Sequence, residues 1–462
     1  MLATCRAASA AGSFFVVAHP RSSPLIAARR QSQIAHLASV LARTNPLMAL
    51  PLKSLPVIER WDCHQCGACC RGSLVPLSAD DLARLRSQKW DERPEFRGVA
   101  TTVRTSWFGD EHRLAQREDG RCVFLADDGA CLIHKEFGAE AKPFVCRMFP
   151  LQVVPRDGFA LLTIRRACPS AAADKGRPVD EHLDEARAMV RGRDLIDSAP
   201  EPPAIKPGES RNWRVAKAML LAVERLLTDQ RFPPVRRLVH ALTFARLVEA
   251  AKTQPLNDGQ LLELFGVLES AAPDETGDLF SKRPPPSSAG AVLFRQTAAE
   301  FIRLHPAFRA RPSWGERLRL TWAAWKFVRG RGKLPSMSPP YPEATFEQLE
   351  QPLGPLDPAV VTPLARLFET TAVSGSYALA ERGDWSMVES IRMLTLLYPV
   401  GLWMLRWLSV GRSPLPSDMP ELISALDRGQ GFASLSGYKQ RRRVQVLAQL
   451  GDLERLVAWY GR

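Results

Sequence analysis

The chain has 462 residues, of which 45% are hydrophobic and 24% are charged. This composition is typical of a globular protein and excludes a disordered chain. The formal net charge is +13, but residues 1–58 carry six Lys and Arg residues and no acid, so the rest of the chain carries only +7. A surplus spread so thinly is typical of a solvated surface, and we therefore expect no nucleic-acid partner.

Residues 1–47 form a leader that is rich in Arg and Ser and has no acid, which is similar to a transit peptide. Its apolar runs are short, and FFVVA at 14–18 falls below the length of a secretory signal, so we expect a cytoplasmic protein. The leader also lacks the periodicity of a packed element. It is interpreted either as a disordered tail or as an over-extended gene model, which leaves Met1 and Met48 open as the start.

Cysteine usage is the strongest signal in the sequence. Eight of the nine cysteines lie between positions 63 and 168, and none follows: Cys63, Cys66, Cys69, Cys70, Cys122, Cys131, Cys146 and Cys168. Disulfides, buried structural thiols and metal ligands are the three interpretations. A large chain without an export signal argues against disulfides. The Cys63-x2-Cys66 spacing, with Gly67 beside it, lets two thiolates reach one cation from a tight turn, so we predict that all eight cysteines are metal ligands.

The identity of the metal stays open at this point. Thiolate-only sites select zinc or iron–sulfur clusters, and eight cysteines suffice for two four-thiolate centres or for one centre with thiols to spare. Because Cys69 and Cys70 are adjacent, we expect them to serve different centres. The series Cys63, Cys66 and Cys69, with the remote Cys168-Pro169, is similar to ferredoxin spacing and favours an iron–sulfur cluster over Zn2+.

Local signals predict short elements around these cysteines, in chain order. Ser78 and Asp81 form a capping-box start for a short helix. The run at 127–129 is a turn signal that brings Cys122 and Cys131 to one end of a hairpin-like excursion. Pro143 and Pro150 bound a short helix that carries Cys146. Two strands around Asp157-Gly158 then return Cys168 to the others, and together these elements define a metal-binding module at 60–195.

The motifs in this region resemble a known family. CHQCGACC, GRCVFLADDGACLIH, PFVCRMFP and the isolated CP at 168–169 are similar to the YkgJ-type CxxCxxCC cysteine-cluster family of proposed zinc- or iron-chelating domains. The resemblance covers about residues 60–175 and implies a metal or iron–sulfur centre on the eight cysteines. The stretch from 122 to 169 resembles the flagellin lysine N-methylases, although the opening run has the compact CxxCGxCC of the general family.

The methylase resemblance implies an enzyme, a protein-lysine N-methyltransferase that moves a methyl group from S-adenosylmethionine to exposed lysines of a protein substrate. The sequence itself has no glycine fingerprint for that cofactor, and no residue is predicted to be catalytic. The alternative is a non-enzymatic, metal-dependent binding or redox-sensing module. Titration with S-adenosylmethionine separates the two hypotheses.

Charged residues beside the cysteines have ordinary interpretations as well as functional ones. We expect His134 to be a turn or surface histidine rather than a zinc ligand, and His64 to face solvent or to form a hydrogen bond that supports the site. Four arginines are expected either to offset thiolate charge or to lie on a solvated surface: Arg71, Arg147, Arg165 and Arg166.

After a Pro-rich linker at 198–210 the sequence becomes helical, which predicts an all-helical domain at 210–462. Apolar residues recur at spacings of three and four. Helices are expected at 213–230, 232–251, 258–271, 290–304, 313–329, 358–382, 385–411, 417–428 and 437–460, with a Pro-rich interruption near 273–290. The fold class is mainly α: a small irregular cysteine-rich metal-binding module with short helices and a β-hairpin, followed by this domain.

The segment 391–410 is the one candidate for membrane insertion. Its uninterrupted apolar run, Met393 to Leu405, is 13 residues long, whereas a bilayer requires about 20. We therefore expect a buried core helix and no transmembrane span. The sequence carries no indication of the oligomeric state.

Overall fold

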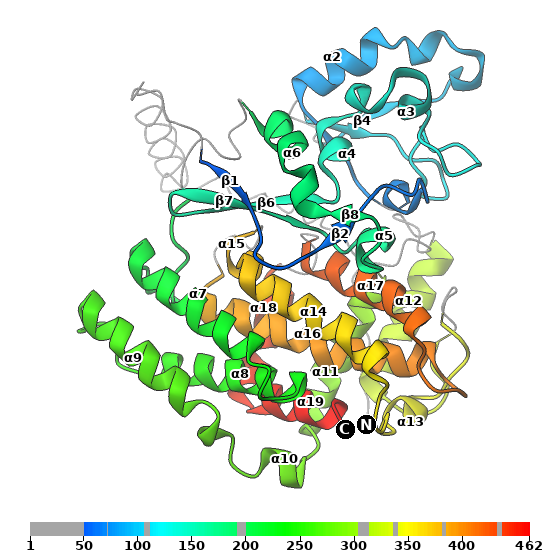
Figure 1. The fold of residues 1–462 in the computed structure, drawn as a ribbon. Helices are drawn as coiled ribbons and strands as arrows, with labels where there is room; N and C mark the ends of the chain where they lie inside the picture. The colour runs from blue at the N-terminus through cyan, green and yellow to red at the C-terminus, as the bar shows by residue number, and fades with distance from the viewer. Residues whose placement is uncertain are drawn as a thin grey trace, which may run out of the picture. The chain divides into compact units, whose positions relative to one another are not determined.

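The computed structural model describes residues 50–71, 73–105, 111–191, 200–303, 314–335, 341–380, 385–431 and 437–462. Internal contacts divide the chain into two units, Met1–Met48 and Ala49–Arg462, and every described residue belongs to the second. The predictions for the leader lie outside the described residues. Within the second unit, short strands and short helices precede a set of long helices, so the predicted fold class is confirmed (Figure 1).

The predicted β-hairpin consists of β6 (Leu151–Arg156) and β7 (Phe159–Ile164), which pair antiparallel over their full length. Gly158 makes the turn with a φ of 78°, a conformation that glycine adopts without steric cost. β1 (Leu52–Ser54) pairs in parallel with the other edge of β7, so the sheet order is β1-β7-β6. Five of the six β7 residues are buried, which shows that both faces of this central strand are covered.

Two smaller sheets complete the strand-containing part. β3 (Pro76–Leu77), β5 (His112–Leu114) and β4 (Thr102–Arg104) form an antiparallel sheet in the order β3-β5-β4. β2 (Arg60–Trp61) pairs antiparallel with β8 (Arg177–Pro178). These pairings join residues far apart in sequence and so hold the cysteine segments within one region of the fold.

Short helices alternate with these strands. They are η1 (Ala68–Cys70), α2 (Ala79–Ser87), η2 (Trp90–Glu92), η3 (Pro94–Phe96), α3 (Leu132–Phe137), η4 (Ala139–Ala141), α4 (Phe144–Met148), α5 (Pro169–Ala172), η5 (Val179–His182) and α6 (Leu183–Val190). Four of them begin at or contain a cysteine. The prediction that prolines bound the helix around Cys146 is confirmed, because Pro143 caps α4 and the chain leaves the helix at Phe149, directly before Pro150.

The C-terminal part is a set of packed helices. They are α7 (Trp213–Thr228), α8 (Pro234–Ala250), α9 (Asp258–Ala271), η6 (Asp274–Thr276), α10 (Leu279–Lys282), α11 (Ser288–Arg303), α12 (Trp314–Arg329), α13 (Phe346–Leu349), α14 (Pro358–Ser374), α15 (Ser376–Leu379), α16 (Met387–Leu408), η7 (Pro416–Asp418), α17 (Met419–Gly431), α18 (Tyr438–Gln449) and α19 (Asp452–Tyr460). Figure 1 shows α16 in the middle of this set, where it packs against α8 and α19.

The core position of α16 explains its hydrophobic sequence. Among the described residues it is the one helix long and apolar enough to cross a bilayer, yet its most apolar 18-residue stretch is entirely buried inside the protein. Ser386 and Glu389 form a capping box at its start, and Pro399 is accommodated without ending the helix. The prediction of a buried core helix at this position is therefore confirmed.

Two predicted helices are each divided in two, and these predictions were wrong. The helix expected at 358–382 breaks between α14 and α15 at Gly375, and the helix expected at 437–460 breaks between α18 and α19 at Gly451. Their φ angles are 67° and 65°. A glycine in this left-handed conformation ends a helix because it turns the backbone away from the helical path.

Candidate metal centre

All eight predicted cysteines line one cavity of about 420 Å³. They are Cys63, Cys66, Cys69, Cys70, Cys122, Cys131, Cys146 and Cys168, and each is a free thiol. Cys122 and Cys168 are buried, whereas Cys63, Cys66 and Cys69 are accessible from the cavity. Residues that span more than a hundred positions of sequence thus meet in space, as the sequence analysis required.

The first cysteine loop owes its shape to two residues with positive φ. Gln65 has a φ of 52° and Gly67 a φ of 67°, and the chain then enters η1. This turn places the Sγ atoms of Cys69 and Cys70 3.9 Å apart. In a tetrahedral site with metal–sulfur bonds of about 2.3 Å, two thiolate sulfurs lie about 3.8 Å apart. The observed spacing is therefore compatible with two ligands of one ion, and the expectation that adjacent cysteines serve different centres remains untested.

The second cysteine loop packs directly on the first. In its turn the N–H of Ala126 donates to the carbonyl oxygen of Ala130, the N–H of Gly129 donates to the carbonyl oxygen of Ala126, and Gly129 has a φ of 86°. A Cβ atom on Gly67 would lie 3.1 Å from the carbonyl oxygen of Gly129, so glycine permits this close approach. The predicted hairpin-like excursion between Cys122 and Cys131 is confirmed.

Backbone hydrogen bonds continue the contact between these loops. The N–H of Cys122 donates to the carbonyl oxygen of Cys70 over 2.7 Å, and Leu125 forms an isolated bridge with Cys131. The cysteines of the first motif and those of the second are therefore tied together by main-chain atoms. Their proximity does not depend on flexible side chains alone.

Helix α2 holds the segment that precedes Cys146. Its predicted capping box is present, because the Ser78 hydroxyl accepts from the N–H of Asp81 and the Asp81 carboxylate accepts from the N–H of Ser78. The buried Asp81 carboxylate also accepts from the N–H of Phe144 over 3.0 Å. Arg84 donates to the carbonyl oxygen of Lys142. Asp81 and Arg84 of α2 thus fix the backbone just before Cys146.

Helix α17, in the helical part of the chain, fixes the backbone that leads into Cys168. The Asp427 carboxylate accepts from the backbone N–H of Ala167 over 2.7 Å and from Nε of Arg165 over 3.1 Å. The Ser424 hydroxyl donates to the carbonyl oxygen of Ala167 over 2.9 Å. Ala167, directly before Cys168, therefore has both its N–H and its carbonyl oxygen bound by side chains of α17.

A buried ion pair stabilises the same junction. Arg166 lies 2.8 Å from the Glu59 carboxylate and also donates to the Thr370 hydroxyl on α14. Thr163 donates to the second Glu59 oxygen over 2.7 Å. Removal of one member would leave a buried charge without its partner, which typically costs about 3–5 kcal/mol.

The cavity keeps several of its thiols protonated. A hydrogen bond with Cys70, followed by desolvation among the surrounding protein atoms, raises the pKa of Cys69 well above its ordinary value, although the residue is exposed at the cavity. Burial raises the pKa of Cys122 to about 11 and also raises the pKa values of Cys146 and Cys168. Interaction with the neighbouring thiols raises these pKa values further. Lys142 acts in the opposite direction on the pKa values of Cys69 and Cys146.

The donor set fits a thiophilic metal, although no coordination shell is preassembled. In the described ranges, no three His, Cys, Asp or Glu side chains stand together in an arrangement that could hold an ion. Eight sulfurs and no inward carboxylate cluster suit zinc or iron rather than magnesium or calcium. A cavity of about 420 Å³ also leaves room for one or two ions or a small cluster.

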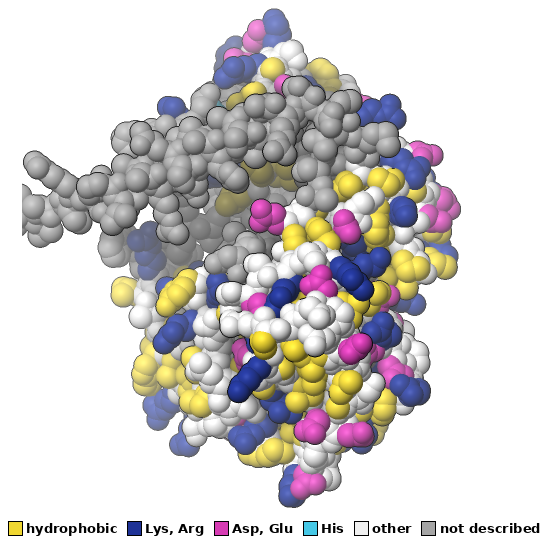
Figure 2. Space-filling model, turned by 90° about the vertical axis from the view of Figure 1, so that its left-hand side faces the viewer, with side chains coloured by type: hydrophobic (Ala, Val, Ile, Leu, Met, Phe, Trp, Pro, Cys, Tyr) yellow, Lys and Arg dark blue, Asp and Glu magenta, His cyan; other side chains and the backbone are white. Residues whose placement is uncertain are grey.

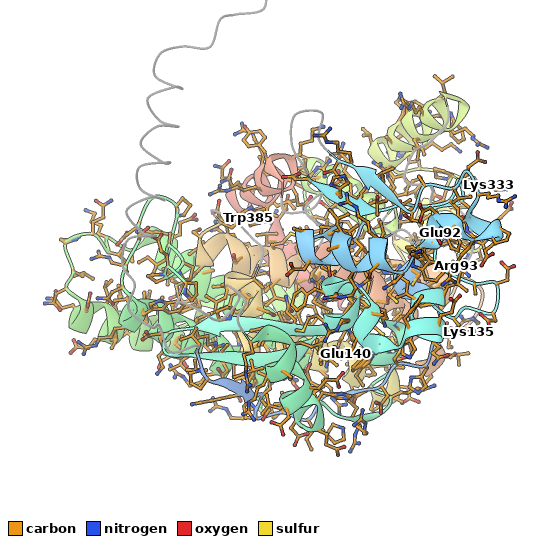
Figure 3. The ribbon with its side chains drawn as sticks, turned by 90° about the horizontal axis from the view of Figure 1, so that it is seen from above. Glu92, Arg93, Lys135, Glu140, Lys333 and Trp385 are labelled. Atoms are coloured by element: carbon orange, nitrogen blue, oxygen red, sulfur yellow. The ribbon has the colours of Figure 1, made fainter. Side chains whose placement is uncertain are left out.

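The predicted histidines and arginines have identifiable surroundings. His134 is exposed at the cavity, as expected for a surface residue, and Nδ1 of His64 lies 3.0 Å from the Ser170 hydroxyl. Arg147 pairs with Glu140, which Figure 3 labels. Together with the ion pairs of Arg165 and Arg166, this contact shows that three of the four flanking arginines are bound to carboxylates.

Comparison with known proteins identifies the cysteine region. Residues 62–169 match the family CxxCxxCC, "Putative zinc- or iron-chelating domain". This match confirms the resemblance to the general cysteine-cluster family for that part of the chain. It supports metal binding without specifying which metal, and it does not extend to the flagellin methylases. Lysine methylation and S-adenosylmethionine binding stay predictions from sequence resemblance.

Part of the chain is also similar to a curated protein. An uncharacterized protein of Methanocaldococcus jannaschii is 28% identical over 137 residues, which cover 28% of this chain. The chain spans 43% of that relative's length. No solved structure matches the chain significantly. The long helices from α7 onward therefore gain no functional assignment from these comparisons.

Several residues that line or support the cysteine cavity were missed by sequence reasoning. Lys142 lies four positions before Cys146 and could have been found from its position in the motif. Ser424, Asp427 and Arg428 bind the backbone before Cys168 from about 260 positions away. No local pattern in the sequence announces such a contact.

Proposed function

We propose that the protein binds zinc or iron through thiolates of the cysteine cavity, and that the bound metal holds residues 62–169 in their folded arrangement. The observation that carries this proposal is that eight cysteines from four separate motifs line one cavity. The match of this region to a chelating domain supports the same chemistry. Cys63, Cys66, Cys69, Cys70, Cys122, Cys131, Cys146 and Cys168 are the proposed ligands.

Side-chain rotation within the cavity would complete the coordination shell. Cys69 lies near the other motifs, because an ionised Cys69 would raise the pKa values of Cys122, Cys146 and Cys168. Lys142 and Arg428 lie where they offset the negative charge of a thiolate centre. The 3.9 Å spacing of Cys69 and Cys70 suits two thiolates on one ion.

An all-thiolate site of this kind is closed, and closed sites are structural or transfer electrons. A bound metal would supply cross-links between the four cysteine motifs, and a cluster would in addition accept or donate an electron. The surrounding residues would orient the ligands: Asp81 fixes the approach to Cys146, and Asp427 fixes the approach to Cys168.

The test uses cysteine variants of the full chain purified anaerobically. We expect wild-type protein to contain stoichiometric zinc or iron, and acid-labile sulfide together with visible absorption would identify a cluster. Cys146→Ser and Cys168→Ser should each lose at least half of the metal. Cys5→Ser is the matched control, because Cys5 is the cysteine outside the 63–168 set, and its metal content should equal that of wild type.

Two results would refute the proposal. One is a folded wild-type protein that contains neither zinc nor iron after anaerobic purification. The other is a set of cavity variants that retain as much metal as Cys5→Ser.

A further inference from the structure

Helix α12 (Trp314–Arg329) exposes large apolar side chains. Leu318 is 72% exposed, Trp322 is 52% exposed and Trp325 is 53% exposed. Their spacing of four and three positions places them on one face of the helix. Single exposed apolar residues are ordinary on a soluble protein, but three large ones on a continuous face mark a docking surface.

The orientation of this face is fixed by a buried residue on the opposite side. Phe327 is 2% exposed and lies against the rings of Phe346, Trp403 and Trp407, with centroid distances of 5.4, 6.1 and 6.5 Å. At about 100° per residue, Phe327 points roughly 180° away from Leu318. Helix α12 cannot turn its exposed apolar face inward without withdrawing Phe327 from the core.

Positive charge is concentrated on the same segment. Between residues 314 and 333 the sequence contains six basic residues and one acid, Glu316, so this stretch holds +5 of the chain's +13. The basic residues are Arg317, Arg319, Lys326, Arg329, Arg331 and Lys333. Lys333, which Figure 3 labels, pairs with Glu343 just outside this stretch. By contrast, Figure 2 shows Lys and Arg interspersed with Asp and Glu on the face it displays.

The basic side chains adjoin the exposed tryptophans. Nζ of Lys326 lies 4.0 Å from the Trp322 ring centroid, and Cζ of Arg329 lies 5.4 Å from the Trp325 centroid. These cations cover ring faces that a stacked nucleobase would need. An aliphatic residue such as Leu318 also adds apolar area that contact with phosphate does not use. The geometry therefore favours a lipid surface over a nucleic acid.

We propose that α12 is a membrane-surface helix that docks the protein on bilayers containing anionic phospholipids. Leu318, Trp322 and Trp325 would enter the boundary between headgroups and acyl chains, where tryptophan is favoured. Lys326 and Arg329 would lie beside the lipid phosphates. The helix lies on the bilayer and does not cross it, and this docking is independent of the proposed metal centre.

The test is flotation of the full-length protein with phospholipid vesicles. We expect binding to vesicles of phosphatidylcholine with phosphatidylserine, little binding to phosphatidylcholine alone, and weaker binding as salt rises. The double variant Lys326→Glu/Arg329→Glu should bind at least about tenfold more weakly. Trp322→Ala/Trp325→Ala should weaken binding by a comparable factor because it removes the inserted rings.

Arg214→Glu/Lys217→Glu is the matched control, since both residues are exposed on α7 at the same three-residue spacing. This control should bind like wild type, and the melting temperature of every variant should show that it is folded. The proposal is overturned if wild type floats with neither vesicle or if the control loses as much binding as the α12 variants. It is also overturned if the protein retains single-stranded nucleic acid through α12 and ignores vesicles.

Discussion

The cysteine region and the helical region of this protein are stabilised in different ways. The helical region is built on one hydrophobic core of 63 buried described residues, all but Ala172 and Ile205 from the helices and loops after residue 210, and α16 runs through it. The strand-containing region has two separate clusters of 12 buried residues each. Small cores provide little net stability, and proteins with such cores commonly add disulfides or metals. From this contrast we expect folding to be coupled to metal binding in the cysteine region and not in the helical region.

Metal removal should cause the largest difference in stability between the two regions. Binding of a structural zinc contributes about 10–16 kcal/mol in small metal-dependent domains at neutral pH. After chelation under reducing conditions, hydrogen exchange should show loss of amide protection throughout 62–169. The long helices α7, α8, α16 and α19 should keep their protection and act as an internal reference. If chelation leaves the amide protection of residues 62–169 unchanged, or lowers the protection of the long helices equally, the coupling is absent.

A substitution in the large core should lower the stability of the helical region without changing metal binding. Trp403 is fully buried on α16 and contacts the rings of Phe294 and Trp407. We expect Trp403→Ala to cost about 3–5 kcal/mol of unfolding free energy and to leave the metal content of the folded protein unchanged. Chemical denaturation with elemental analysis measures both quantities.

Trp403→Phe is the matched variant for this position. The indole N–H of Trp403 has no hydrogen-bond acceptor among the described residues, so its loss removes no favourable contact. Trp403→Phe should therefore cost clearly less than Trp403→Ala. Equal losses would contradict the assignment of this residue to packing.

The junction residue Asp427 should affect both regions to an intermediate degree. Asp427→Asn weakens the acceptor that holds the Ala167 N–H and Arg165, and we expect a loss of about 2 kcal/mol of stability. Because Ala167 precedes Cys168, metal affinity should fall by about tenfold or more. The control is Asp418→Asn, which weakens the ion pair that Asp418, the last residue of η7, forms with Arg412. If the two variants have equal metal affinity, Asp427 does not position the site.

A pH effect confined to the helical region should be the smallest. Burial alone would raise the pKa of Glu389, but hydrogen bonds from Arg441, the Ser386 backbone and Gln445 outweigh it and lower the pKa below 4.5. A lowered folded-state pKa stabilises the protein above pH 4.5, and this contribution is lost as the pH falls through the folded-state value. The stability advantage of wild type over Glu389→Gln should therefore shrink on acidification. A pH-independent difference in denaturant titrations would contradict this account.

Much of the cysteine region was predictable because its signals are local. The Ser78 capping box, the turn at Gly129 and the hairpin at Gly158 each depend on a few adjacent residues. The cavity that unites the cysteines follows from their number and spacing. The support that Asp427 gives to Cys168 was not predictable, because it joins residues about 260 positions apart.

The helical region was predictable in outline and less so in detail. Apolar periodicity placed most of the long helices, including α9 with its predicted bounds. Periodicity continues smoothly through Gly375 and Gly451, so the breaks there depend on a backbone conformation that the pattern does not encode. The basic, tryptophan-bearing face of α12 was missed because charge was averaged over the chain after residue 58.

X-ray absorption spectroscopy at the zinc and iron edges tests the central claim most directly. The account predicts that anaerobically purified protein has a first coordination shell dominated by sulfur at about 2.3 Å. A shell made only of nitrogen and oxygen, or the absence of both metals from folded protein, would contradict it.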